Sequence, residues 1–270
     1  MTQNQQVLDL LVPMLGADGI LCLTLSDPAR RNALSESMLM ALGAAFDAAS
    51  TNPDVRVVIL AAAGPVFCAG HDVKEITAGR QNADRGRAYF TKILDQCSSV
   101  MQKIVACPKP VIAEIDGVAT AAGCQLVASC DLAIASETAQ FCTPGVHIGL
   151  FCSTPMVALS RNLANKHAME MLLTGDMVPA SRAAEIGLVN KVVPSAELRV
   201  ASMALAGKIA AKSSLTVATG KRAFYQQKEM DLAAAYNYAS QIMVENMLAR
   251  DAEEGIAAFI EKRAPDWRDE

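Results

Sequence analysis

Two short stretches rich in small residues could bind a carbonyl oxygen through their main chain. The first is CAGHD, residues 68–72, after the apolar run VRVVIL, and the second is TAAGC, residues 120–124, after PVIAEID. A helix opening leaves backbone N–H groups unpaired, and the helix dipole adds partial positive charge there. Two such openings that face each other would hold one oxygen between two amide donors, as an enolate or tetrahedral oxyanion requires. Ordinary glycine-containing turns are the alternative, and the spacing alone does not decide.

The side chain expected to do proton chemistry beside the second stretch is that of Gln125, an amide and not a carboxylate. An amide donates and accepts hydrogen bonds, but it does not exchange a proton near pH 7. The sequence therefore predicts a group that polarises a carbonyl, while the group that moves protons is missing or lies elsewhere.

The composition is that of a compact soluble protein able to bury a sizeable core. The chain has 270 residues, of which 52% are hydrophobic and 19% charged, enough for one large domain or a domain with an appendage. A net charge of −4 and an aromatic content of 4% argue against nucleic-acid binding. The most apolar segment, VVILAAAGPVFCAG, is short and broken by Gly64-Pro65, so no membrane span is predicted. Small molecules and further copies of the chain are the expected partners.

The cysteines predict reduced thiols in a cytoplasmic protein. None of the eight forms a CxxC pair, and only three histidines are present, so neither a zinc site nor any other metal site is expected. The N-terminal stretch MTQNQQVLDLLVP has no basic region and only a short apolar run, so it predicts no signal peptide.

Strand and helix patterns alternate along the first two thirds of the chain. GILCLTLS and VRVVIL are predicted strands, the second covered on both faces, and Ser35 can cap a helix that follows the loop DPARRNAL. A long helix is expected over about 83–107, and KPVIAEIDGVATAAGCQLVASCDLAIAS predicts strand, loop, short helix and strand. Such alternation indicates a mostly parallel sheet with right-handed crossovers.

The last part of the chain has a different residue pattern. Residues 195–263 are predicted to be almost wholly helical, with breaks near Ser213-Ser214 and Met230-Asp231. We expect a core over 1–194 and a helical region over 195–270.

Five stretches of this sequence, in order and over nearly the whole chain, resemble the crotonase superfamily of acyl-CoA hydratases and isomerases. They are DPARRNALS, GPVFCAGHDVKE, VIAEIDGVATAAGCQLVASCDLAIAS, AQFCTPGVHIGL and TGDMVPASRAAEIGLVNKVVP. Within the superfamily, GHDVKE, ATAAGCQLVASCD and GLFCSTP are most similar to the group of enoyl-CoA hydratase domain-containing protein 3. The resemblance implies an α/β fold, the ClpP-like crotonase spiral of ββα units. It also implies that the helical C-terminal region forms trimers, often paired into hexamers.

The resemblance also implies which residues bind an acyl-CoA thioester. The oxyanion donors would be the backbone N–H groups of His71 and Ala122. Arg30 and Arg31 are candidates for the phosphates of coenzyme A, because guanidinium offers several donors; solvated loop arginines are the alternative. The other expected substrate-binding residues are Ala69, Gly70, Asp72, Val73, Lys74 and Gly123. Coenzyme A enters as part of the substrate, and no separate cofactor is expected.

The chain departs from the hydratase pattern at both proton-moving positions. Hydratases of the superfamily use two glutamates, and the matching positions here are Gln125 and Gly145. Each such group contributes about 10²–10⁴-fold in rate, so ordinary hydration is expected to be weak or absent.

Four nearby groups are candidate substitutes for the missing glutamates. Ser153 matches the position where dienoyl-CoA isomerases of the superfamily carry aspartate, and His147 could titrate near neutral pH. The His71 imidazole could contribute beside its own N–H, and Cys152 would need a base and a lowered pKa to act as a nucleophile. A bicarbonate beside Gly145, as in dihydroxynaphthoyl-CoA synthases, is a further alternative.

Three functions remain open from the sequence. The first is an acyl-CoA enzyme of hydratase or isomerase type that works through an oxyanion-stabilised enolate. The second is a non-catalytic acyl-CoA binding protein. A structural or RNA-binding role is the third, and the acidic charge balance weakens it.

Overall fold

A computed structural model describes residues 10–270 of the chain. Most of the N-terminal stretch on which the signal-peptide prediction rests lies outside these residues. The strands are β1 (Leu11–Leu15), β2 (Ile20–Leu25), β3 (Val57–Ala62), β4 (Val66–Cys68), β5 (Val111–Ile115), β6 (Val118–Thr120), β7 (Leu132–Ser136), β8 (Gln140–Cys142), β9 (Val178–Pro179) and β10 (Lys191–Val193).

Five of the nine gaps between consecutive strands have eleven or more residues, and helices fill these gaps. The α-helices are α2 (Glu36–Thr51), α3 (Val73–Gly79), α4 (Arg87–Ala106), α5 (Ala122–Ser129), α6 (Ser153–Asn162), α7 (Asn165–Thr174), α8 (Ala180–Glu185), α9 (Leu198–Ala210), α10 (Ser214–Gln227), α11 (Leu232–Leu248) and α12 (Arg250–Glu261). The short 3₁₀ helices are η1 (Pro28–Arg30), η2 (Pro144–Ile148) and η3 (Ser195–Glu197).

Two sheets form the core, and both are mostly parallel as predicted. The larger has the order β1-β2-β3-β5-β7-β10, with only β1 antiparallel to its neighbour, and the smaller has the order β4-β6-β8-β9. Each turn of the spiral gives one strand to the large sheet, a three-residue strand to the small sheet, and then a helix. This is the expected spiral of ββα units. The sequence alone indicated loops at β4 and β6, because three residues are too few to show a strand period.

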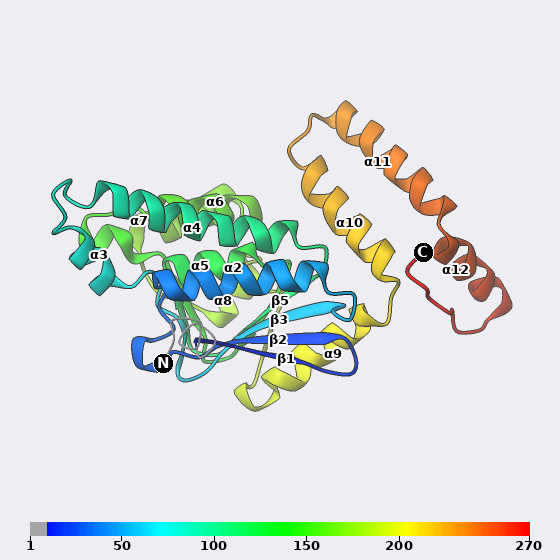
Figure 1. Ribbon diagram of the computed structural model, residues 1–270, viewed down its shortest axis with the longest axis horizontal. Helices are drawn as coiled ribbons and strands as arrows, with labels where there is room; N and C mark the ends of the chain where they lie inside the picture. Colours follow the sequence, from blue (N-terminus) through cyan, green and yellow to red (C-terminus); the bar gives the residue numbers. More distant parts are fainter. Residues whose placement is uncertain (1–9) are drawn as a thin grey trace.

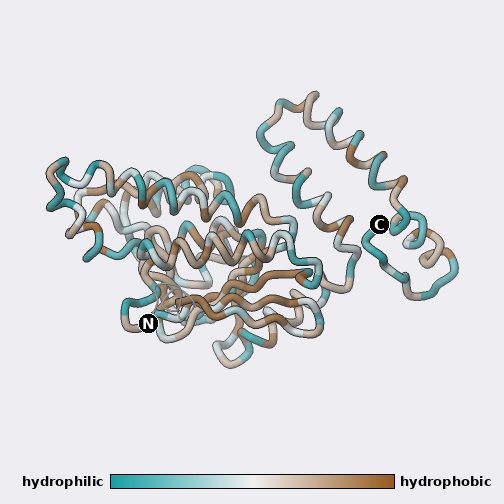
Figure 2. Tube along the Cα trace, in the orientation of Figure 1, coloured by the Kyte–Doolittle hydropathy of each residue, from teal (hydrophilic) through white to brown (hydrophobic). Residues whose placement is uncertain are grey.

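Alternating side chains of the large sheet face two different layers. Leu21, Leu23 and Leu60 pack with helices α2, α4 and α5 in the main core. Ile20, Ile59 and Ala206 belong to a second cluster on the opposite face, where α9 covers the sheet (Figure 1). Figure 2 shows that β2 and β3 are among the most uniformly hydrophobic segments, as expected for strands covered on both faces.

The C-terminal helices extend away from the sheets (Figure 1). The predicted breaks at 213–214 and 230–231 are present, and a further break at Ala249 separates α11 from α12. Helix α9 packs on the sheet, whereas α10 and α11 have no buried residue in the single chain. The change in packing therefore follows residue 213 rather than 194, and the domain boundary near Pro194 stays a prediction.

A partly buried ion pair fixes α10 to the core. Lys221 Nζ donates to Asp131 Oδ2 at 2.6 Å and to the carbonyl oxygen of Ile104 at 3.0 Å, and only 7% of its side chain is exposed. Tyr225 donates its hydroxyl to the other carboxylate oxygen of Asp131 at 2.9 Å. Because removing one partner of a buried pair leaves a charge without compensation, these contacts determine where α10 lies.

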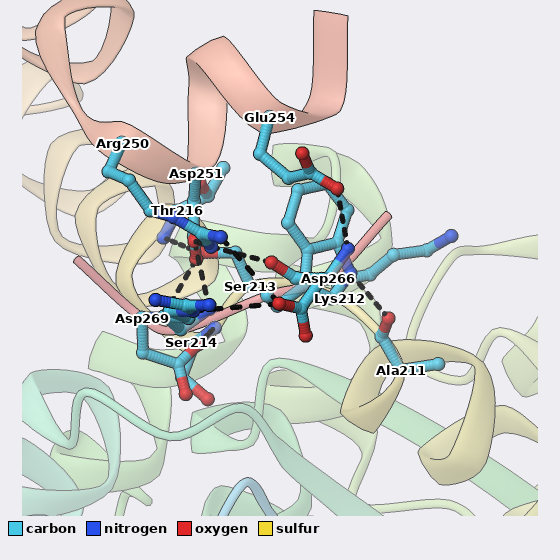
Figure 3. Close-up of polar contacts among 12 residues, drawn as sticks. Ala211, Lys212, Ser213, Ser214, Thr216, Arg250, Asp251, Glu254, Asp266 and Asp269 are labelled. Carbon is cyan, nitrogen blue, oxygen red and sulfur yellow. Dashed lines mark hydrogen bonds and ion pairs between the residues drawn. The ribbon is translucent and has the colours of Figure 1, made fainter. Parts of the chain in front are cut away.

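The last residues of the chain fold back along α12 and tie it to the start of α10 (Figure 3). Asp251 is buried and accepts the backbone N–H groups of Arg268 and Asp269, both at 2.9 Å. Trp267 donates its indole N–H to the carbonyl oxygen of Ala211 at 3.0 Å. The C-terminal segment thus stabilises the arm formed by α10–α12.

None of the helices in residues 10–270 has the length and apolar character needed to cross a bilayer. In the same residues, no group of three or more histidine, cysteine, aspartate or glutamate side chains is arranged to hold a metal ion. All eight cysteines are free and buried, which confirms the predicted state of the thiols.

Direct backbone contact positions α5 against the loop after β4. A Cβ atom at Gly123 would lie 2.2 Å from the carbonyl oxygen of Cys68 and 2.8 Å from Cys68 Cβ. All eight residues of α5 are buried, so the helix has no direction in which to move away. Only glycine permits this approach.

Gly123→Ala should therefore destabilise the protein by at least about 2 kcal/mol, because the added methyl overlaps backbone atoms. Gly43→Ala in the middle of α2 is the matched control: its Cβ would have no neighbour closer than 3.9 Å. We expect the control to stabilise by roughly 0.5–1 kcal/mol through higher helix propensity. Denaturant unfolding of both variants measures the difference, and equal effects would contradict the packing described.

Candidate functional site

The candidate site lies where three parallel strands of the small sheet end. β4 leads to the loop 69–72, β6 leads to Ala121 and α5, and β8 leads to Thr143 and η2. Ala121 N donates to the carbonyl oxygen of Cys142 at 2.9 Å, so the end of β8 holds the turn that opens α5. Because the strands are parallel, all three loops meet at the same edge of the sheet.

The two turns predicted to face each other are in contact. A Cβ atom at Gly70 would lie 2.9 Å from Ala121 Cβ and 3.3 Å from the backbone nitrogen of Ala122. Gly70 has φ +83°, and Ala121 has φ +51° with ψ −118°, a conformation that alanine rarely adopts. Such strained residues are found where the surrounding structure holds a functional turn.

The backbone N–H groups of His71 and Ala122 have no hydrogen-bond acceptor among residues 10–270. Two neighbouring groups are engaged: Leu34 N donates to Gly70 O at 2.8 Å, and Ala69 N donates to Arg31 O at 3.1 Å. Ala122 is the first residue of α5, so its N–H has no partner within the helix either. Two unpaired donors thus follow the two turns that touch.

Asp72 caps α3 and supports the first turn. Its Oδ1 accepts the backbone N–H groups of Lys74 at 2.8 Å and Glu75 at 3.3 Å, and the residue is 8% exposed. Val73 is 65% exposed on the same helix, where it is available to a ligand that lies along the surface. Asp72 therefore holds the start of α3 in place, and the side chain of Val73 is accessible to a ligand.

Arg30 and Arg31 differ in whether their guanidinium groups are free to bind a phosphate. Arg30 donates through Nε to Asp27 at 2.6 Å, and its Nη1 lies 3.8 Å from Asp72 Oδ2. The exposed Arg31 makes no side-chain hydrogen bond or ion pair with the described residues. Of the two candidates for a phosphate, only Arg31 has its guanidinium free, because Arg30 ties η1 to the cap of α3.

Sequence reasoning missed Asn32, which holds this loop in place. Asn32 is fully buried, and its Nδ2 donates to the carbonyl oxygens of Ala63 at 2.9 Å and Val66 at 2.7 Å. Its φ is +51°, within the left-handed region that asparagine tolerates better than most residues. The signal in the sequence was an asparagine directly after two loop arginines.

Gln125 lies one helical turn beyond Ala122 and is 4% exposed. Its Oε1 has no hydrogen-bond partner in the described chain. The residue lines a cavity of about 470 Å³ between α4, α5, α6 and α10. A buried amide without a partner is costly, and a ligand or water can relieve the cost.

Gly145 leaves no room for a carboxylate. A Cβ atom there would lie 2.9 Å from Cys152 Sγ and 2.9 Å from the carbonyl oxygen of Leu150. The Cys152 thiol therefore takes the space where a side chain at 145 would begin. A bicarbonate beside Gly145 stays a prediction, because these contacts concern only the first atom of a side chain there.

Two of the suggested substitute acid–base groups point elsewhere. His147 is exposed, and its Nε2 lies 2.8 Å from the carbonyl oxygen of Thr174 at the end of α7. Ser153 is exposed as well, and its hydroxyl donates to the carbonyl oxygen of Phe151 at 3.3 Å with no base beside it. Local contacts thus hold both side chains, and the suggestion that either moves protons at the site stays a prediction.

Burial shifts the pKa of His71 and of three cysteines near the turns toward the neutral form. It lowers the pKa of His71, against the smaller opposing effects of the Leu34 backbone and the Glu75 carboxylate. Burial raises the pKa of the Cys152 thiol and of the neighbouring Cys124 and Cys142 thiols. None of these cysteines is a thiolate near neutral pH, so the condition set for a Cys152 nucleophile is not met.

Comparison with known proteins agrees with this architecture. The family model described as enoyl-CoA hydratase/isomerase matches residues 16–270. The chain is 49% identical over 250 residues to enoyl-CoA hydratase domain-containing protein 3, mitochondrial, of Rattus norvegicus, covering 93% of this chain and 82% of the relative.

Two solved structures extend the likeness to three dimensions. An enoyl-CoA hydratase of Mycobacterium smegmatis is 49% identical with a TM-score of 0.91, covering 96% of this chain and 98% of that one. The human enoyl-CoA hydratase domain-containing protein 3 is 47% identical with a TM-score of 0.90, covering 96% of this chain and all of that one. These matches confirm the predicted group. The chain belongs to the enoyl-CoA hydratase/isomerase family and has the crotonase fold.

Proposed function

We propose that this protein binds acyl-CoA thioesters and polarises their carbonyl with the backbone N–H groups of His71 and Ala122. The observation that carries the proposal is that both groups are unpaired and follow two turns in direct contact. Donors fixed in this way stabilise the negative charge that develops on a thioester oxygen as an enolate forms. Arg31 and Lys74, both exposed, are the proposed contacts for the phosphates of coenzyme A.

Ordinary enoyl-CoA hydration by this protein is weak or absent in our proposal. Hydration needs one group to deprotonate water and another to protonate carbon, and neither Gln125 nor Gly145 can exchange a proton. The site thus keeps the part that stabilises charge and lacks the part that moves protons. The proposed activity is of the lyase or isomerase type, limited by proton transfer.

A non-catalytic acyl-CoA binding protein is the second candidate function. The observation that favours it is that burial shifts the pKa of the His71 imidazole and that of the Cys152 thiol toward the neutral form. A panel of enoyl-, dienoyl- and hydroxyacyl-CoA thioesters separates the two candidates. Turnover of any of them supports the enzyme, whereas tight binding without turnover supports the binding protein.

The assembly we propose is a homotrimer or a dimer of trimers built through the C-terminal helices. Supporting it, α11 and α12 carry large apolar side chains that the single chain leaves open, including Tyr236 at 70%, Leu248 at 76% and Phe259 at 86% exposed. Exposed apolar surface of this kind marks interaction sites. We place the protein in the cytoplasm, a reducing compartment in which buried free thiols persist.

Light scattering of the purified protein should therefore give three or six times the mass of one chain, because burial of the apolar face of α11–α12 favours association. A mass equal to one chain at micromolar concentration would contradict the proposed assembly.

Removing one of the two main-chain donors should weaken thioester binding. His71→Pro deletes the N–H, and Gly70 before it has no Cβ to clash with the proline ring. Calorimetry should show that this variant binds butyryl-CoA about tenfold more weakly, because one hydrogen bond to the thioester oxygen is lost.

His71→Ala is the matched control, since it keeps the N–H and removes only the imidazole. It should bind butyryl-CoA within about twofold of the parent. Equal loss of affinity in both variants would assign the effect to the side chain and count against the backbone donors. Thermal melting establishes that each variant is folded.

Restoring one carboxylate should raise hydration. Gln125→Glu is expected to increase crotonyl-CoA hydration at least about tenfold, because the carboxylate can exchange protons one turn from the donor at Ala122. Position 145 is left unchanged, since a side chain there would meet Cys152 Sγ and Leu150 O.

Gln226→Glu, at an exposed position of α10, is the control for a carboxylate introduced elsewhere. It should leave the rate at the parent level. A correctly folded Gln125→Glu variant with no gain over that control would count against the proposed carbonyl site.

A further inference from the structure

Residues 266–269, which we call the C-terminal clasp, close the arm on its own starting point (Figure 3). The chain leaves the core after α9, runs outward along α10 and returns along α11 to α12 (Figure 1). The clasp then reaches the junction between α9 and α10. There Trp267 donates to the carbonyl oxygen of Ala211 at 3.0 Å, and Ser214 N donates to Asp269 Oδ1 at 2.5 Å. The two ends of the arm are therefore joined at one place.

Asp251 of α12 is the buried centre of the clasp, and both of its carboxylate oxygens are used. Oδ1 accepts from Arg268 N at 2.9 Å and from Arg250 Nη1 at 3.1 Å, while Oδ2 accepts from Asp269 N at 2.9 Å. The side chain of Asp251 is fully buried. A buried N–H group without an acceptor is costly, so this position requires a side chain with two acceptor oxygens.

Arg56 joins the clasp to the core. It directly precedes β3, and its guanidinium spans three acceptors: Nε donates to Ala210 O at 2.7 Å, Nη2 to Lys212 O at 2.7 Å, and Nη1 to Asp269 Oδ2 at 2.9 Å. The first two acceptors lie at the end of α9 and just after it, and the third belongs to the clasp. One planar group thus fixes the junction and the clasp to the same strand of the large sheet.

The apolar face proposed for assembly is made by two helices whose relative angle needs such a support. Leu248 of α11 and Phe259 of α12 are among its exposed side chains. A single residue, Ala249, separates the two helices, so rotation at that residue changes the angle between them. Because the clasp ties α12 to the start of α10 and to Arg56, it fixes this angle.

We infer that the C-terminal clasp controls assembly: when closed it holds α12 at the angle at which the apolar face of α11–α12 meets another copy of the chain, and when open it lets α12 turn away. The inference rests on the proposed homotrimer or dimer of trimers. A face that is fixed before contact loses less conformational entropy on association than a mobile face does. An open clasp therefore weakens assembly although every side chain of the face is still present.

The fluorescence of Trp267 reports whether the clasp is closed, because this is the only tryptophan of the chain. Its indole packs on α12, where a Cβ atom at Gly255 would lie 3.0 Å from Trp267 Cη2. Asp251→Asn leaves one acceptor oxygen in place of two, so at least one donor of the clasp loses its partner. We expect the emission of this variant to shift to longer wavelength as the indole becomes exposed to water.

Light scattering over a range of protein concentrations measures the consequence for assembly. In Asp251→Asn, the concentration at which half of the chains are assembled should rise at least about tenfold, the effect of one buried hydrogen bond to a charged group. Asp231→Asn is the matched control. Asp231 Oδ1 accepts from Ala234 N at 2.9 Å at the start of α11, and asparagine caps a helix equally well, so emission and assembly should stay at the parent level.

Arg56→Lys opens the clasp from the core side and keeps the test decisive if Asp251→Asn proves unstable. The ammonium group keeps the charge, but it does not span the three acceptors that the guanidinium reaches. We expect the same emission shift and the same weakening of assembly. Thermal melting establishes that each variant is folded.

The outcomes separate this inference from the assembly on which it rests. An emission shift with assembly at the parent level would overturn it, because the clasp would then be open without effect. Weaker assembly without an emission shift, or unchanged emission in both Asp251→Asn and Arg56→Lys, would overturn the role of the clasp as well. An unmodified protein with the mass of one chain would instead overturn the proposed assembly, and the inference with it.

Discussion

The contact between two stretches of main chain is the constraint on which the site depends. The carbonyl of Cys68 lies against Gly123, and Gly70 lies against Ala121 and the nitrogen of Ala122. No side chain separates the two turns, so their amides keep their positions relative to each other whatever neighbouring side chains are present. This explains how the chain can depart from the hydratase pattern at Gln125 and Gly145 and still present two unpaired N–H groups.

The two departures differ in physical character. At Gly145 the space of the missing side chain is taken by Cys152 Sγ and Leu150 O, so the loop has closed around the glycine. At Gln125 a polar side chain of glutamate's length remains buried beside a cavity, with its Oε1 unpaired. Position 145 thus offers no side chain that could form a hydrogen bond, whereas the amide at position 125 keeps its capacity to donate and accept.

Residues around the two turns hold the loops of the site in place through hydrogen bonds and ion pairs. Asn32 joins the arginine loop to the start of β4, Asp72 caps α3, and Arg30 bridges Asp27 and Asp72. On the other side of the molecule, Lys221 and Asp131 hold α10 beside the cavity that Gln125 lines. The C-terminal arm is therefore connected to this cavity through a partly buried ion pair, although α11 and α12 extend away from the core.

The sequence by itself determined the features that depend on local patterns. The buried strands β2 and β3, the helix that starts at Ser35, the parallel arrangement and the two small-residue turns all follow from periodicity, capping and glycine content over a few residues. Ser35 accepts from Met38 N as its position predicted.

Only the tertiary structure decided the contacts between distant segments. The side chain of His147 contacts the carbonyl oxygen of Thr174, 27 residues away, and the guanidinium of Arg30 lies near the carboxylate of Asp72. The filling of the Gly145 space by Cys152 and the cavity shared by four helices likewise have no local signature. A side chain's partner is set by where the spiral brings other turns of the chain, and residue type and spacing do not encode that position.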